Sequence, residues 1–544
     1  MGVKKSLFLL FIIISNSIFS QERYAVSFTD KNTSSFTTTN PIEFLSQKSI
    51  DRRAKHGIVV TQQDIPVNQI YIDSVVAQGA IYYNKSKWMN LVVVKITDTN
   101  DIPAILGLPF VANMILVKSN DTIGKVGNAE SKLFYETVND LDYGFAADQI
   151  NIMEGEFLHN LGYKGQGMTI AVLDAGFTNV NSISAFDALW NENRIYGYWD
   201  FVNNNDSVFD KHSHGTAVLS TMAAVKTGEL IGTAPDANYF LLRTEDAVTE
   251  TISEEYNWLA AVEFADSAGV DIINSSLGYT TFDDVLDNHT YTDMDGNTTI
   301  VTKAADLAFS KGILVINSAG NSGTNPWLYI GAPADGNNVL SVGAVEHDGS
   351  YAEFSSRGPT VDGRIKPNVS TIGKYSAIIN TNGNVVYGSG TSFSSPEMAG
   401  MSAALWQAFP DKTNAEIKNA IEKSANQYFF PDDKLGYGIP NFRIAYMILG
   451  GLEVVDNSQN QLLNVYPQPY SNNFNLIYYS SKKQTIRVRV VDVAGKLVYD
   501  YDWNVRAKVI ESVHLQGLYS AAGLYTLMLI DEDNERITQK IVKQ

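Results

Sequence analysis

The serine at position 392 stands in a segment that could supply a catalytic nucleophile. Residues 390–396 read GTSFSSP, and residues 398–406 are small and apolar enough to form a buried helix. Proline is tolerated in the first turn of a helix, so we expect Pro396 in the first turn of a helix that continues through residues 398–406. A hydroxyl at a helix N-terminus lies near unpaired backbone N–H groups, which stabilise negative charge on a substrate oxygen. Alone, the segment fits an ordinary loop serine equally well.

A serine nucleophile needs a general base and a carboxylate that orients that base. His214 precedes a small, apolar run over residues 216–224 that predicts a buried helix. Its alternatives are a capping histidine or, with His212, an H-x-H metal pair, although no third metal ligand is evident nearby. Asp174 ends a predicted buried strand over residues 168–173, where an Asp before a Gly is also common in turns. Together, Asp174, His214 and Ser392 would form a hydrolytic triad.

These motifs resemble those of the subtilases, the subtilisin-like serine proteases. Residues 174–176 (DAG), 214–216 (HGT) and 390–396 follow the family's order of Asp, His and Ser. Ala175 stands where the family usually has a hydroxyl residue. The serine segment is not G-x-S-x-G, which argues against a serine lipase.

A fourth segment extends the resemblance. Residues 312–323 (GILVINSAGNSG) resemble the family's oxyanion segment, which implies that the side-chain amide of Asn321 is the oxyanion donor. The resemblance covers about residues 145–450. It implies an α/β peptidase domain with a mostly parallel sheet flanked by helices, the subtilisin-like fold.

The resemblance also implies a substrate pocket. Residues 271–278 (DIINSSLG) resemble the strand whose free edge pairs with an extended peptide. The implied pocket for the residue before the scissile bond is lined by Ser276, Leu277, Gly278, Ser318, Ala319 and Gly320, with Gly331 at its base. Because these walls are small, we expect the pocket to accept large apolar side chains.

No metal ligand can be assigned. Residues 293–297 (DMDGN) lack the EF-hand spacing and favour a turn. Residues 225–232 are shorter than the subtilase loop that often binds calcium. Structural calcium elsewhere is compatible with the sequence, and the chemistry itself requires no cofactor.

Three further units surround the peptidase segment. Residues 1–20 carry two lysines before a short apolar core, the pattern of a secretory signal peptide. Residues 21–125 predict a small α+β unit, with strands at 23–28, 81–83 and 89–96 and helices at 41–54 and 70–78. It resembles a subtilase pro-region, and its alternative is a retained N-terminal domain. The polar residues 119–150 are expected to include the processing site.

The C-terminal residues 464–544 follow a polar linker over residues 452–463. Five short β segments separated by turns predict a β-sandwich, at 474–479, 485–491, 497–501, 523–530 and 536–543. The unit resembles the C-terminal sorting domains of type IX secretion, and its alternative is a carbohydrate- or protein-binding module.

Composition narrows the class of protein. With no cysteine, the chain can form neither disulfides nor a thiolate site, and its formal charge of −19 argues against nucleic-acid binding. No apolar run after the signal predicts a membrane span. We therefore expect a secreted or surface serine endopeptidase that acts on proteins or peptides and is exported through the periplasm and outer membrane by the type IX machinery. The alternative from another class is a surface binding or adhesion protein on an inactive subtilase scaffold.

Overall fold

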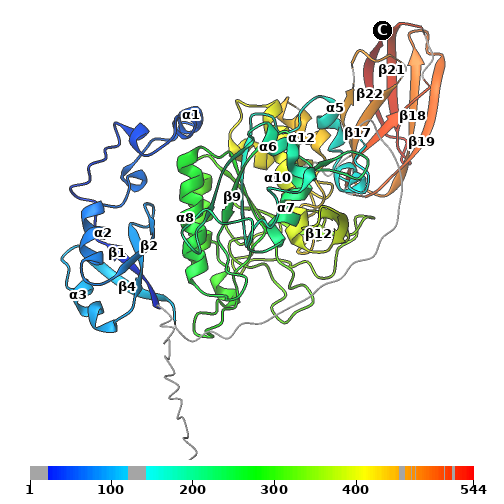
Figure 1. Ribbon diagram of the computed structural model, residues 1–544. Helices are drawn as coiled ribbons and strands as arrows, with labels where there is room; N and C mark the ends of the chain where they lie inside the picture. Colours follow the sequence, from blue (N-terminus) through cyan, green and yellow to red (C-terminus); the bar gives the residue numbers. More distant parts are fainter. Residues whose placement is uncertain are drawn as a thin grey trace, which may run out of the picture.

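The computed structural model describes residues 22–119, 142–451 and 460–544, except 467, 472, 508 and 518–520. The predicted signal peptide, most of the expected processing region and residues 452–459 of the linker lie outside this description. The predicted fold class is confirmed: a parallel α/β layer stands between a small α+β unit and an antiparallel β unit (Figure 1).

The peptidase domain is built on a seven-stranded parallel sheet with the strand order β13-β12-β11-β10-β5-β9-β6. Most of these strands are buried along their whole length, as expected for a parallel sheet that is covered on both faces. The strands are β5 (Thr169–Asp174), β6 (Ile195–Asp200), β9 (Asn238–Arg243), β10 (Ile272–Ser275), β11 (Leu314–Ser318), β12 (Leu340–Val345) and β13 (Val369–Ile372).

Alternate residues of β5 enter two separate cores. Ile170 and Val172 pack in the core that contains α7 (His214–Ala223) and α10 (Thr391–Ala408). Ala171 and Leu173 pack in the core that contains α8 (Ser253–Ala268) and α9 (Ile300–Ser310). The sheet therefore has helices on both faces, and the carboxyl ends of its strands stay free to carry a site.

The remaining elements of this domain are short. They are α4 (Ala147–Asn151), α5 (Glu156–Asn160), α6 (Asp187–Asn191), α11 (Asn414–Ser424), α12 (Phe442–Leu449), the hairpin of β7 (Val225–Lys226) and β8 (Leu230–Ile231), and the hairpin of β14 (Ser376–Ile379) and β15 (Val385–Gly388). Residues 293–297 form the expected turn, in which Asp295 accepts hydrogen bonds from the backbone of Asn297 and Thr298 at 2.7 and 2.8 Å.

Helix α10 begins earlier than its sequence predicts. It starts at Thr391, so Pro396 lies in the second turn and not in the first. The small polar residues of the first turn favour loops locally, but residues 391–406 are all buried, and tertiary packing overrides that preference. Ser392 therefore lies inside the first turn of the helix.

The N-terminal unit, residues 22–119, is an antiparallel sheet with the order β2-β3-β1-β4 and its own apolar core. Its strands are β1 (Glu22–Phe28), β2 (Ile81–Ser86), β3 (Leu91–Ile96) and β4 (Val111–Lys118), and its helices are α1 (Gln47–Lys55), α2 (Gln69–Val76) and α3 (Ile102–Leu106). The predicted single helix at 41–54 is a 3-10 turn, Pro41–Glu43, followed by α1. Strand β4 and helix α3 were not predicted.

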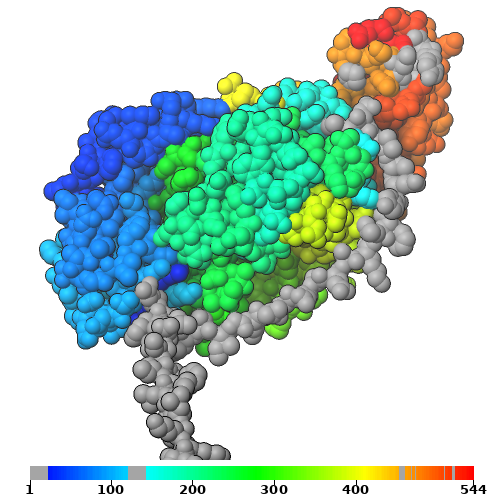
Figure 2. Space-filling model, viewed as in Figure 1, coloured from blue at the N-terminus to red at the C-terminus, as the bar shows by residue number. Residues whose placement is uncertain are grey.

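This unit lies against helix α8 (Figures 1 and 2), and buried charges join the two. Asp266, which is fully buried, accepts hydrogen bonds from Arg52 at 2.7 Å, Arg53 at 2.8 Å and Lys87 at 3.0 Å. One turn earlier, Glu263 accepts the backbone N–H groups of residues 87 and 88, at 2.6 and 3.0 Å. These two carboxylates of α8 thus hold the N-terminal unit in place.

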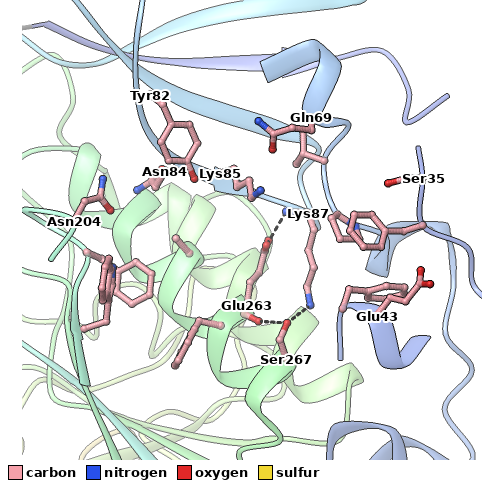
Figure 3. Close-up of a pocket in the computed structure, with 18 residues that line it drawn as sticks. Ser35, Glu43, Gln69, Tyr82, Asn84, Lys85, Lys87, Asn204, Glu263 and Ser267 are labelled. Atoms are coloured by element: carbon pink, nitrogen blue, oxygen red, sulfur yellow. Dashed lines mark hydrogen bonds between the residues drawn. The ribbon is translucent and has the colours of Figure 1, made fainter. Parts of the chain in front are cut away.

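Next to these contacts, the interface between the N-terminal unit and α8 contains a cavity. A cavity of about 930 Å³ lies between strand β2 and helix α8, with Tyr82 and Lys85 on one side and Glu263 and Ser267 on the other (Figure 3). Lys87 crosses it to Ser267, with 2.8 Å between the ammonium nitrogen and the hydroxyl oxygen. Trp88, Leu91 and Val93 of the N-terminal unit belong to the same apolar core cluster as residues of α8, so apolar packing adds to the buried charges in holding this interface.

The C-terminal unit consists of two antiparallel sheets, β16-β17-β20 and β19-β18-β21-β22, consistent with the predicted β-sandwich. Its strands are β16 (Gln461–Tyr466), β17 (Phe474–Ser480), β18 (Gln484–Asp492), β19 (Leu497–Val505), β20 (Val509–Leu515), β21 (Gly523–Ile530) and β22 (Arg536–Lys543). Strand β16 starts within the predicted linker, and β20 was not predicted. Ile477, Tyr479 and Ile510 pack with Ile444 of α12, so the unit contacts the peptidase domain through an apolar cluster. None of the described helices is both long and apolar enough to span a lipid bilayer.

Candidate active site

Asp174 and His214 meet at the carboxyl edge of the sheet. Asp174 is the last residue of β5 and is fully buried, and His214 is the first residue of α7. The Nδ1 atom of His214 lies 2.9 and 3.0 Å from the two carboxylate oxygens of Asp174. Gly215 makes this approach feasible, because a Cβ atom there would lie 2.4 Å from the carbonyl oxygen of Gly176 and 3.0 Å from the Cβ of Asp174.

The environment of His214 suits a general base. Burial disfavours its charged form, but the charge and the hydrogen bond of Asp174 outweigh burial and raise the pKa of His214 above its ordinary 6.5. The bond to Asp174 uses Nδ1, and among the described residues Nε2 has no hydrogen-bond partner. The side chain is 28% exposed, so Nε2 remains free to accept a proton.

Ser392 lies at the N-terminus of α10, beside this pair. The ring of the next residue, Phe393, lies 6.3 Å from the imidazole of His214, centre to centre. The Ser392 hydroxyl donates a long hydrogen bond of 3.4 Å to the carbonyl oxygen of Ser276.

Pro396 has a role in joining Ser392 to the segment that follows β10. Proline has no N–H group, so it cannot donate to the carbonyl oxygen four residues earlier, which is that of Ser392. The hydroxyl of Ser276 donates to this carbonyl instead, at 3.0 Å. Ser276 and Ser392 are therefore joined by two hydrogen bonds in opposite directions.

Asn321 follows β11, and hydrogen bonds from Thr391 orient its side-chain amide. Its carbonyl oxygen accepts the backbone N–H of Thr391 at 2.9 Å and the hydroxyl of Thr391 at 3.0 Å. The same hydroxyl accepts the backbone N–H of Gly320 at 3.1 Å. The oxygen end of the Asn321 amide is thus fixed, and its NH₂ group donates to no other described residue. This arrangement leaves the NH₂ group available to an anionic oxygen.

A cavity of about 170 Å³ opens between Ser392 and Asn321. All seven residues predicted for the substrate pocket line it: Ser276, Leu277, Gly278, Ser318, Ala319, Gly320 and Gly331. Trp327 and Tyr329, which were not predicted, also line it. A Cβ atom on Gly331 would lie 2.8 Å from the methyl carbon of Thr280, so the side chain of Thr280 closes the cavity next to Gly331.

A second, larger cleft of about 780 Å³ is lined by His214, residues 276–278 and the loop 245–250. Glu245, Glu250 and Glu254 bring carboxylate oxygens within 4.8 Å of one another here, the one such group of possible metal ligands in the described ranges. In the β7–β8 hairpin, within residues 225–232, Glu229 is paired with Lys226 at 2.7 Å.

His212 is exposed, and its Nδ1 accepts the backbone N–H of His214 at 3.2 Å. Sequence reasoning missed the roles of Thr391 and Pro396, although both stand within the serine motif. Their partners lie far away in the sequence, so no local pattern could have identified them.

Comparison with known proteins places these residues in a family. Residues 165–438 match the model of the subtilase family, residues 23–132 that of a peptidase S8 propeptide domain of Bacteroidota, and residues 464–544 that of a secretion system C-terminal sorting domain. Together the three matches span most of the chain.

Individual relatives agree with the family match. The chain is 30% identical to subtilisin E of Bacillus subtilis (strain 168) over 326 residues, which cover 58% of this chain and 74% of that protein. It is 30% identical to subtilisin of Bacillus pumilus over 302 residues, which cover 54% and 97%. Among solved structures, the epidermin leader peptide processing serine protease of Staphylococcus aureus has a TM-score of 0.54 at 16% identity, covers 80% of this chain and 100% of its own, and supports the fold.

Proposed function

Because this chain belongs to the subtilase family and is a subtilisin-like serine endopeptidase, we propose that Asp174, His214 and Ser392 are its catalytic triad and Asn321 its oxyanion donor. The observation that carries the proposal is the placement of four residues at strand and helix ends, with Asp174 bonded to His214 and with Ser392 and Asn321 on one cavity. The imidazole is bonded to both oxygens of Asp174, and Asn321 and Ser392 line the same pocket.

The reaction follows from these positions. Ser392 Oγ attacks the carbonyl carbon of the peptide while His214 Nε2 takes the hydroxyl proton. The carbonyl oxygen becomes an oxyanion, which accepts hydrogen bonds from the Asn321 amide and the backbone N–H of Ser392. His214 returns the proton to the departing amine, which leaves an acyl-enzyme. Water, deprotonated by His214, then releases the acid and restores Ser392.

Asp174 acts by positioning His214, and Thr391 acts by positioning Asn321. Asp174 holds the imidazole in the tautomer with the proton on Nδ1 and stabilises the imidazolium that forms. Thr391 fixes the oxygen end of Asn321, so that the NH₂ group is aimed before substrate arrives. The cavity of about 170 Å³ supports acceptance of a large apolar side chain before the scissile bond.

The other units support production and export of the enzyme. The propeptide domain makes the chain a zymogen, and we propose that its boundary lies near residue 125 and its cleavage within 119–150. The sorting domain implies export to the cell surface or the medium. We propose that residues 464–544 direct this export through the periplasm and outer membrane. No cofactor enters the chemistry, and structural calcium has no assigned ligands.

The test compares the wild-type chain with Ser392→Ala. Wild type should be labelled by a serine-directed fluorophosphonate and should hydrolyse casein, and Ser392→Ala should do neither while keeping its circular dichroism spectrum. Ser402→Ala is a matched control, since its hydroxyl bonds within α10, to the carbonyl of Met398 at 2.7 Å, away from the site. A wild-type protein that is neither labelled nor active would support the alternative, a binding protein on an inactive scaffold.

A further inference from the structure

The cleft beside His214 has an acidic floor that the proposed chemistry does not use. Glu245, Asp246, Glu250 and Asp283 line it together with His214. The segment 276–278, which is expected to pair with an extended substrate, forms another of its walls. The carboxylates therefore face the path of substrate residues that precede the scissile bond.

Carboxylate oxygens of Glu245, Glu250 and Glu254 lie within 4.8 Å of one another, and these three residues form no ion pair within the described part of the chain. Glu254 is anchored by the backbone N–H groups of Asp246 and Thr251, both at 2.8 Å. In the described part of the chain, the ion pairs at this cluster are those of Asp246 with Arg243 and Lys118, both at 3.9 Å. Burial and the neighbouring carboxylates raise the pKa of Glu245 to about 7 and that of Glu250 to about 8. A cation placed among them would remove this repulsion.

The walls above the carboxylates are apolar. Val248 is 70% exposed and Val285 is 73% exposed, and both line the cleft with Phe282. A lysine or arginine side chain has an apolar stem and a charged end, so it can contact such walls while its charge reaches the floor. Such apolar side chains offer no ligand atom to a metal ion.

The N-terminal unit already places an ammonium group at this cleft. Lys118, the last residue of β4, donates to the hydroxyl of Thr249 at 3.0 Å and lies 3.9 Å from a carboxylate oxygen of Asp246. Thr249 and Asp246 both line the cleft, so a lysine side chain from a neighbouring segment already contacts two of its lining residues.

An extended peptide alternates its side chains between two faces. If the residue before the scissile bond enters the cavity of about 170 Å³, the second and fourth residues counted back from the bond point to the other side, toward the acidic cleft. We propose that the enzyme prefers protein substrates with lysine or arginine at one of these two positions. This inference rests on the proposed function of the triad.

The test uses the processed wild-type enzyme and fluorogenic peptides that share one residue before the scissile bond. Lysine is compared with norleucine, which lacks the ammonium group, at the second and then at the fourth position. We expect kcat/KM to be at least about tenfold higher for lysine at one position, as for a charge-assisted hydrogen bond. Glu250→Gln and Asp283→Asn should each reduce the lysine-to-norleucine ratio at least threefold, and Asp411→Asn, a carboxylate outside the cleft, should leave it unchanged.

Three results would overturn the inference. One is a ratio near one at both positions in wild type, and another is an unchanged ratio in both cleft variants. The third is a metal site: millimolar calcium would then raise the melting temperature and abolish the preference in wild type, but not in Glu250→Gln. Failure of the proposed function itself looks different, since no peptide would be cleaved and fluorophosphonate would not label Ser392.

Discussion

Replacing Asp266 by asparagine should release the N-terminal unit from the peptidase domain. Asp266 is fully buried and faces three cations, Arg52, Arg53 and Lys87, at 2.7 to 3.0 Å. Removing one partner of a buried ion pair typically costs about 3–5 kcal/mol, because the other charge stays buried without compensation. That cost corresponds to a roughly 150- to 5,000-fold weaker association.

The structure places the expected value at the lower end of this range. Arg53 would keep Asp64 at 3.1 Å, Arg52 would keep the carbonyl of Lys311 at 3.1 Å, and Lys87 would keep Ser267 at 2.8 Å. We therefore expect about 3 kcal/mol, or a roughly 150-fold rise in the dissociation constant. Burial raises the pKa of Asp266, but the three cations outweigh burial and lower it. Its contribution is therefore present above pH 3.8 and is lost as the pH falls through the lowered pKa.

The assay uses Ser392→Ala protein with a site for an unrelated protease placed within residues 120–141. After cleavage at that site, dissociation of the labelled N-terminal unit is measured with and without Asp266→Asn. Lys48→Met is the matched control at the same interface, because Lys48 pairs with Asp271 at 2.7 Å but is 40% exposed. Its expected effect is below about 1 kcal/mol. A change of less than tenfold for Asp266→Asn would refute the view that buried charge holds this interface.

The remaining predictions concern catalysis, processing and export. Asn321→Ala should lower kcat by roughly 10²–10³ with little change in KM, the range known for one oxyanion donor of the related subtilisin; an effect on KM alone would remove Asn321 from the oxyanion site. The rate should rise with pH on a limb whose midpoint lies above 6.5, since Asp174 raises the pKa of His214 and only the neutral imidazole accepts a proton. A midpoint near 5 would contradict this. N-terminal sequencing should find the wild-type mature chain starting within residues 118–150, whereas Ser392→Ala should keep its N-terminal unit; if both chains keep it, the unit is a retained domain. Truncation after residue 460 should leave kcat of the purified enzyme unchanged but lower its melting temperature, because the apolar contact with α12 is lost, and cell fractionation should find the truncated chain in the periplasm. Its normal appearance outside the cell would refute the sorting role.

The sequence predicted those parts of the fold and site that depend on local patterns. The buried run before Asp174 predicted β5, and the small apolar run after His214 predicted α7. Strands β21 and β22 were predicted with the bounds that the structure has. The four catalytic candidates came from four ordered motifs; in the structure His214 bonds with Asp174, and Ser392 and Asn321 line one cavity together with the seven predicted pocket residues.

The parts that were not predicted join residues far apart in the chain. Lys87 and Asp266 meet across the domain interface, and Ser276 bonds with Ser392. Neither pair leaves a pattern that one segment could reveal. The acidic character of residues 245–268 was visible in the sequence, but the approach of Glu245, Glu250 and Glu254 within 4.8 Å required the loop geometry. Helix α10 was predicted to start too late, because burial rather than propensity holds its first turn.

The missing N–H of Pro396 has a mechanical consequence for substrate binding. Because the carbonyl oxygen of Ser392 receives no hydrogen bond from the backbone of Pro396, it accepts one from the hydroxyl of Ser276. Ser276 is the first residue of the segment along which a substrate would lie. We therefore expect a displacement of that segment by an entering peptide to act on Ser392 through this hydrogen bond. Pro396→Ala would give the helix a competing donor for the same carbonyl and so loosen this coupling.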